Sequence, residues 1–172
     1  IPIIEVDGKD HILFEVRSQN ITQPGEVSFP GGRVEMGETF KKAAIRETME
    51  ELLLDYEDIE YLGYSSMILN SSYTHVKSFY GRLHKNISEI KYNEEVERVF
   101  TVDIDYLKNH SPIVYRSPYK LDFPEDFPFD KIPHGRKYNF ATVYKELYFY
   151  DTDPVIWGLT AKLLKNFIER LD

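Results

Sequence analysis

The sequence predicts an α/β fold, in which helices pack on a β-sheet, and three patterns carry that prediction. Asp7-Gly8, the strongest short hairpin signal, lies between two apolar runs at 1–6 and 11–16, so the chain should open with two paired strands. Apolar residues recur at helical spacing over 39–53, which predicts an amphipathic helix. Extended, strand-like segments then follow this helix along the chain.

The elements after the helix can be placed in order. Extended segments are expected at 61–69, 75–83 and 97–102. The last of these leads into a short helix at 104–108, for which Asp103 supplies the N-cap. A closing helix is expected from Pro154 to about Leu171, with Asp153 as N-cap and Pro154 in the first turn. Strands and helices therefore mix along the chain, with no internal repeat.

One stretch, at about 110–142, is predicted to be an insertion without regular structure, ahead of a strand at 143–150. Five prolines lie between Pro112 and Pro133, and eleven aromatic residues lie between Tyr115 and Tyr150. Dense proline removes backbone donors and prevents regular structure, while aromatic rings supply apolar surface. The segment can be read either as a long loop pinned on the core or as a lid over a substrate.

Composition limits the classes of function. The 172 residues are enough for one domain, 1–172, with a real core. There is no cysteine, so disulfides, thiolate zinc sites and a cysteine nucleophile are excluded. A net charge of −8 argues against nucleic acid or an anionic membrane as a non-specific partner. No apolar run approaches the roughly 18 residues of a membrane span, and no signal peptide is recognisable, so we expect a soluble, cytoplasmic protein.

The helix at 39–53 carries charge on one face. At about 100° of rotation per residue its apolar side chains cluster on one side. Three glutamates point nearly opposite them: Glu47, Glu50 and Glu51. Like charges at these spacings repel, so a compensating cation from outside the helix is expected, and Gly31-Gly32 just upstream lets a backbone carbonyl approach such an ion. The alternative is a solvated acidic surface with no ligand.

The whole string from Gly32 to Leu54 resembles the Nudix box, Gly-x5-Glu-x7-Arg-Glu-U-x-Glu-Glu-x-Gly-U, in which U is aliphatic. The positions that match, all at the required spacing, are Gly32, Glu38, Arg46, Glu47, Glu50, Glu51 and Leu54. Two positions depart from the pattern, because Thr48 stands where an aliphatic residue is usual and Leu53 replaces the last glycine. That glycine normally accommodates a left-handed helix end.

The resemblance implies the fold and a role for each of these residues. The fold would be a Nudix-type α/β/α sandwich around a mixed sheet. Glu50 and Glu51 would bind Mg²⁺ or Mn²⁺ directly, Glu47 would be a ligand or the general base, and the Gly31 carbonyl would be a further ligand. Arg46 would pair with Glu38 and brace the loop. The family cleaves nucleoside diphosphate derivatives by attack of water at phosphorus, and the cations neutralise the diphosphate and activate the water.

Segments upstream and downstream of the box narrow the resemblance to coenzyme A pyrophosphatases. The segments at 16–32 and 95–100, together with 156–161, look like that subfamily's pattern, although 18–25 is one residue shorter than usual. Arg17 is the candidate contact for a substrate phosphate, its alternative being a surface salt bridge. The other residues expected at the substrate are Ser28 and Arg33. A later carboxylate for the metal centre is expected from Glu95, with Glu94 and Glu97 as alternatives.

We therefore expect a metal-dependent diphosphatase that cleaves coenzyme A or acyl-coenzyme A to adenosine 3′,5′-bisphosphate and a 4′-phosphopantetheine. One alternative is a diphosphatase of another nucleoside diphosphate derivative, such as NADH or ADP-ribose. The other is a ligand-binding module of the same fold without catalysis. The expected partner is a small-molecule substrate, with neither nucleic acid nor membrane, and the expectation leaves room for a homodimer.

Overall fold

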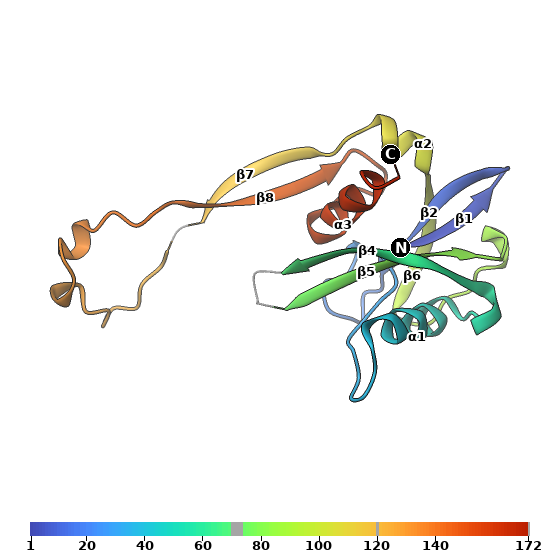
Figure 1. The fold of residues 1–172 in the computed structure, drawn as a ribbon, viewed down its shortest axis with the longest axis horizontal. Coiled ribbons are helices and arrows are strands. Elements are labelled where there is room, and N and C mark those ends of the chain that lie inside the picture. The colour runs from blue at the N-terminus through green and yellow to red at the C-terminus, as the bar shows by residue number, and fades with distance from the viewer. Residues whose placement is uncertain (70–73, 120, 172) are drawn as a thin grey trace.

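A mixed sheet forms the body of the protein (Figure 1). The computed structural model describes residues 1–69, 74–119 and 121–171. The strand order of this sheet is β3-β2-β1-β5-β4, with β6 also pairing with β2. Strands β1 and β5 run parallel, and the other neighbours run antiparallel. The strands are β1 (Pro2–Val6), β2 (Lys9–Arg17), β3 (Val27–Ser28), β4 (Ile59–Leu69), β5 (His75–Leu83) and β6 (Val96–Asp103).

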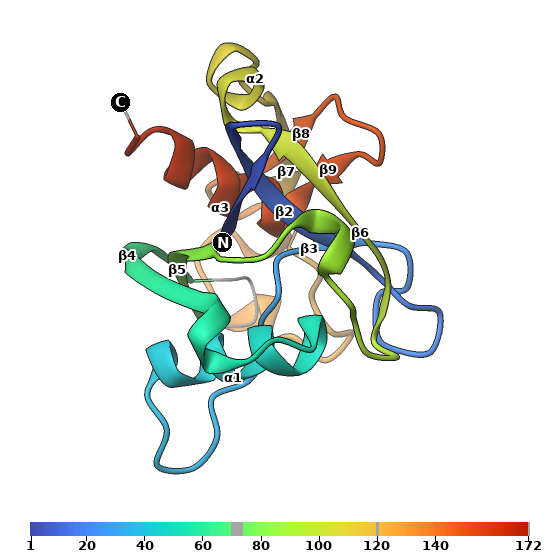
Figure 2. The ribbon, with the colours of Figure 1, turned by 90° about the vertical axis from the view of Figure 1, so that its right-hand side faces the viewer.

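Helices cover both faces of this sheet. The side chains of β1 and β2 alternate between two cores, one on each face. Ile12 and Phe14 face the helices α2 (Ile104–Asn109) and α3 (Gly158–Ile168). Leu13, between them in sequence, faces the other way and belongs to the core that contains Leu52 at the end of α1 (Phe40–Leu52). The layers are visible in Figure 2. The predicted α/β/α sandwich with a mixed sheet is confirmed.

Helix α1 begins and ends close to its predicted limits. The Thr39 side chain caps its N-terminus by accepting a hydrogen bond from the Lys42 backbone at 3.3 Å. At the other end Leu53 takes the left-handed conformation, with φ 48° and ψ 48°, and Leu54 N–H donates to the Met49 carbonyl at 3.1 Å. Leu53 thus adopts the backbone conformation that a glycine would take at lower cost.

We expect Leu53→Gly to stabilise the protein. A side chain in the left-handed region costs about 1–2 kcal/mol, so its removal stabilises the folded protein. Part of that stabilisation is lost because glycine has greater freedom in the unfolded chain. Because Leu53 is 57% exposed, little packing is lost. Thermal unfolding should show a Tm higher by roughly 1–4 °C. Leu53→Ala keeps the left-handed Cβ and is the control; an equal gain in that variant would contradict the explanation.

A second, smaller sheet carries a long ribbon away from the body (Figure 1). Its order is β7-β8-β9, formed by β7 (Ile113–Tyr119), β8 (Val143–Tyr150) and β9 (Ile156–Trp157). The prediction that 110–142 lacks regular structure is wrong for β7. Pro118 is accommodated because β7 is an edge strand of this sheet, where one side of the backbone needs no donor. The segment is neither pinned on the core nor placed over α1.

The last helix begins later than predicted. It starts at Gly158 with Trp157 at the N-cap position, so the prediction of Asp153 as N-cap and Pro154 in the first turn is wrong. The chain first turns at Thr152, whose hydroxyl donates to the Pro154 carbonyl at 2.8 Å. It then continues as β9, because pairing with β8 buries Ile156 completely. In the described ranges, the helices are all too short or too polar to cross a membrane.

Candidate active site

The glycine turn before α1 lies directly against the glutamate face. The Gly31 N–H donates a hydrogen bond to Glu51 Oε2 at 2.8 Å, with Gly31 at a φ of +154° that other residues rarely adopt. A side chain on Gly32 would overlap the Glu47 carboxylate. Both glycines are therefore needed for this close approach of backbone to carboxylates.

Arg46 connects the turn to the helix, and it forms the predicted pair with Glu38. Its Nε lies 3.1 Å from Glu38 Oε1, its Nη2 lies 3.2 Å from Glu38 Oε2, and Nη2 also donates to the Arg33 carbonyl at 3.0 Å. The guanidinium holds the pKa of Glu38 below its usual range. The same cation reaches the acidic face, because Nη1 lies 2.9 Å from Glu47 Oε1 and 3.0 Å from Glu50 Oε2.

Glu51 is the buried member of the three glutamates. It is only 5% exposed, and burial raises the pKa of its carboxyl to about 8, with the negative charge of Glu15 as the next cause. The hydrogen bond from Gly31 opposes this shift, and the charges of Glu47 and Glu95 add to it. A carboxyl in this environment ionises readily only when a cation compensates it.

Glu15 belongs to the same cluster, although it lies outside the motif that predicted the other members. It lies on the face of β2 that carries Leu13, it is 2% exposed, and Ser28 Oγ donates to its Oε1 at 2.9 Å. Its Oε2 is buried and has no hydrogen-bond partner among the described residues. Burial is the main cause that raises the pKa of Glu15. A signal was available, since one acid interrupts an otherwise apolar run at 12–16.

Glu95, the first of the three later candidates, acts electrostatically on this cluster. It immediately precedes β6, and its carbonyl accepts a hydrogen bond from Ser18 N–H at 2.8 Å. Its charge contributes to the raised pKa of both Glu15 and Glu51. Glu97 instead accepts a hydrogen bond from the Gln19 side chain at 3.1 Å.

The donor chemistry of this cluster suits a hard divalent cation. Carboxylates crowd together from β2, α1 and the start of β6, and one buried oxygen of Glu15 is unsatisfied. In the conformation described here Arg46 holds Glu47 and Glu50, and Gly31 holds Glu51. The described residues contain no group of three acidic or histidine side chains already converged as a metal site. The cluster therefore offers oxygen donors of the right chemistry, although Glu47, Glu50 and Glu51 are held by partners within the protein and Glu15 keeps one unpaired oxygen.

The structure places the expected substrate contacts in different surroundings. Arg17 Nε donates to the Thr22 carbonyl at 2.9 Å and so holds the loop that follows β2. Ser28 is engaged by Glu15, and Arg33 presents its carbonyl to Arg46. Ser28 and Arg33 line the large pocket described next, and Arg17 is not among its described lining residues.

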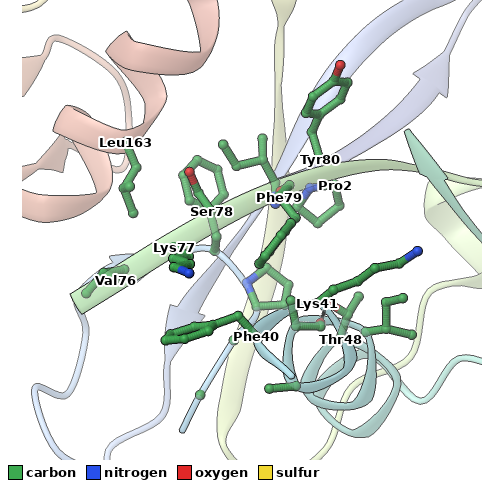
Figure 3. Close-up of a pocket in the computed structure, with 18 of the residues that line it drawn as sticks. Pro2, Phe40, Lys41, Thr48, Val76, Lys77, Ser78, Phe79, Tyr80 and Leu163 are labelled. Atoms are coloured by element: carbon green, nitrogen blue, oxygen red, sulfur yellow. Dashed lines mark hydrogen bonds between the residues drawn. The ribbon is translucent and has the colours of Figure 1, made fainter. Parts of the chain in front are cut away.

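A pocket of about 900 Å³ lies beside the carboxylate cluster, between α1, β5 and the turn that precedes α1. Figure 3 shows Phe40 and Lys41 of α1 facing the side chains of β5, among them Lys77 and Phe79. Gly31 and Gly32 also line the pocket. Because Gly31 N–H binds Glu51, a ligand in the pocket would border the carboxylates.

The sequence model of the NUDIX domain matches residues 1–119, which is more than half of the chain. The chain belongs to the NUDIX family. Nudix hydrolase 3 of Caenorhabditis elegans is 31% identical over 183 residues, which cover 100% of this chain and 71% of that protein. The peroxisomal coenzyme A diphosphatase NUDT7 of Mus musculus is 31% identical over 118 residues, which cover 67% of this chain and 50% of that protein. The chain thus spans half the length of the mouse protein.

Solved structures of other hydrolases share the fold. An Ap4A hydrolase of C. elegans in a binary complex aligns with a TM-score of 0.53 and 21% identity, covering 61% of this chain and 77% of that chain. A NUDIX hydrolase of Nitrosomonas europaea aligns with a TM-score of 0.52 and 18% identity, covering 98% of this chain and 68% of that chain. At these identities the likeness shows the architecture alone.

Membership in the NUDIX family decides the reaction class. The protein is a pyrophosphohydrolase that acts on phosphorus anhydrides, and its substrates are nucleoside diphosphate derivatives. NUDIX hydrolases generally need divalent metal ions, and the carboxylate cluster offers oxygen ligands for such an ion.

Proposed function

We propose that this NUDIX hydrolase cleaves the diphosphate of coenzyme A or an acyl-coenzyme A, giving adenosine 3′,5′-bisphosphate and an (acyl-)4′-phosphopantetheine. The observation that carries the proposal is the 31% identity to the mouse coenzyme A diphosphatase over 118 residues. The segments at 16–32 and 156–161, which resemble the coenzyme A subfamily, support it. The pocket beside the carboxylates has room for the nucleotide half, at about 900 Å³.

Mg²⁺ or Mn²⁺ would be held by the carboxylate cluster and the turn. The proposed ligands are Glu47, Glu50, Glu51, Glu95 and the Gly31 carbonyl. When bound, the ion neutralises the diphosphate and lowers the pKa of the attacking water. Glu51 would enter as a carboxylate, because a cation removes the penalty that burial places on its charge.

The protein's own residues would orient the reaction. Arg46 holds the turn through Glu38 and the Arg33 carbonyl, so the Gly31 backbone stays against the carboxylates. Glu47, next to Gly32, would serve as a ligand or as the base that takes a proton from water as its oxygen attacks phosphorus. The attack breaks the anhydride bond, and each half keeps one of the two phosphates of the diphosphate.

Cleavage should require metal and should give two defined products. With coenzyme A and Mg²⁺ or Mn²⁺, mass spectrometry is expected to find adenosine 3′,5′-bisphosphate and 4′-phosphopantetheine in equal amounts. Excess EDTA should abolish turnover while the circular dichroism spectrum of the fold is retained, because the core does not depend on the ion. NADH and ADP-ribose serve as comparison substrates. Faster cleavage of either one would reject the coenzyme A proposal, and full turnover in EDTA would reject the metal assignment.

A further inference from the structure

The ribbon of β7 and β8 carries a cluster of aromatic rings at its far end (Figure 1). We call residues 121–142 the tip, and the NUDIX model, which matches residues 1–119, ends before it. The centre of the Phe123 ring lies 4.6 Å from that of Phe127, 5.3 Å from that of Phe129 and 4.9 Å from that of Phe140. These rings hold the tip together away from the sheet of the body, and the proposed function makes no use of it.

The ribbon leaves apolar side chains in water. Strand β9 pairs with β8 at Phe149 and Tyr150, at the end of the ribbon next to the body. Farther out, β7 and β8 pair with each other alone among the described strands. The exposed apolar side chains along them include Val114, Tyr115, Tyr119, Val143 and Tyr144. Because a two-stranded ribbon is only marginally stable by itself in water, this part of the protein needs a further surface to pack against.

The charges of the tip are separated by sign along the chain. The acidic segment, 122–130, has no Lys or Arg, and its acids are Asp122, Glu125, Asp126 and Asp130. The basic segment, 131–137, has no Asp or Glu, and its cations are Lys131, Arg136 and Lys137. All of these residues are exposed. Within residues 1–69, 74–119 and 121–171, none of them forms a salt bridge, so the charges of both segments are left for a partner.

This separation makes the tip complementary to itself. When the same surface of two copies meets across a two-fold axis, residue i of one copy contacts residue j of the other, and j contacts i. The acidic segment of each tip can then lie against the basic segment of the other. Elsewhere the net charge of −8 favours separation of the copies. The ribbon is also long enough, since residues 113–147 exceed the roughly 20–30 residues that one side of a stable interface needs.

We propose that the ribbon is a dimerisation arm, which packs along the arm of a second copy of this chain with the acidic segment of each tip against the basic segment of the other. The same contact covers the apolar side chains of β7 and β8. Because it needs neither substrate nor metal, dimerisation is independent of the proposed function. Its test is therefore the mass of the particle in solution.

Size-exclusion chromatography with light scattering should give the wild-type protein twice the mass of one chain. Two variants reverse one segment each, and both should have the mass of one chain, because like charges would then meet. An equimolar mixture of the two should return to twice that mass, because a positive tip meets a negative one. The variants are Glu125→Lys/Asp126→Lys/Asp130→Lys and Lys131→Glu/Arg136→Glu/Lys137→Glu.

Two further variants separate the arm from general effects. Replacement of residues 120–142 by Asn-Gly joins Tyr119 to Val143, which lie opposite each other in the ribbon, and should give a monomer with the circular dichroism spectrum of a folded body. The matched control changes net charge as the acidic-segment variant does, but at exposed acids outside the arm, and should remain a dimer. It is Glu5→Lys/Glu57→Lys/Asp151→Lys.

Three results would overturn the proposal. The first is a wild-type particle with the mass of one chain. The second is a dimer that persists in both reversed variants or without the tip, because the copies would then associate through another surface. The third is a mixture of the reversed variants that stays monomeric, because the two tips would then not face each other.

Discussion

Glu51→Gln is expected to lower the rate of hydrolysis by about 10²–10³-fold or more and to stabilise the metal-free protein at alkaline pH. The rate falls because a charged ligand is lost where transition-state charge is stabilised. The stability rises because glutamine needs no ionisation in a buried position next to Glu15. Activity assays with Mg²⁺ and thermal unfolding in EDTA measure the two effects on the same variant.

The raised pKa of Glu51 determines how the stability of the metal-free protein changes with pH. The folded-state pKa of Glu51 is raised from about 4.5 to about 8, so the folded protein keeps a proton that the unfolded chain releases. The contribution to stability is complete below about pH 4.5 and is lost as the pH rises through about 8. In EDTA, the Tm of the wild-type protein should therefore fall more over this range than that of Glu51→Gln.

Glu50→Gln is the matched control, because the Glu50 side chain is 56% exposed. It should lose activity as a ligand variant but gain no stability at alkaline pH, since no desolvation is relieved. Near-normal turnover in both variants would show that the metal assignment is wrong. Equal stabilisation of both would show that burial of Glu51 is not the cause.

Gly32→Ala is expected to reduce kcat by roughly 10²-fold with little loss of stability. The new Cβ would occupy the position of the Glu47 carboxylate, which is the far end of a flexible side chain and can move aside. The fold tolerates that movement, but displacement of a reacting group by about 1 Å can cost 10²-fold in rate. Steady-state kinetics and thermal unfolding together test this separation.

Gly37→Ala is the control for a general effect on the loop, because it should lower stability without displacing Glu47. Gly37 has a φ of +82°, and a Cβ there would meet no atom within 4 Å. Alanine should lower the Tm through backbone strain, while Glu47 keeps its position. If Gly32→Ala loses stability as Gly37→Ala does and keeps its kcat, the steric argument about Glu47 is wrong.

The sequence predicted those parts of the molecule that depend on local spacing. The helix at 39–53 and the contact between Arg46 and Glu38 follow from residues that are at most a few turns apart in one motif. The hairpin of β1 and β2 likewise follows from Asp7-Gly8 between two apolar runs. In these cases a single stretch of chain contains both partners of the interaction.

The features that sequence reasoning missed depend on distant partners. Glu15 joins the carboxylate cluster only because β2 places it opposite a helix that ends 37 positions later, at Leu52. Strand β7 exists because β8 supplies its pairing partner across the ribbon, which overrides the local effect of Pro118. The start of α3 is displaced because residues 156–157 pair with β8 before the helix begins. Local propensity contains none of this information.

The packing of α3 has a consequence for how the protein is made in the cell. Phe167, which shares a core with Ile12 and Phe14, is synthesised more than 150 residues after them. At about 5–20 residues per second, that delay is roughly 8–30 s. During this time one face of the central strands has no cover, so nascent chains would be at risk of aggregation and would be clients for chaperones. The core that contains the end of α1 can pack before the core that contains α3 is complete.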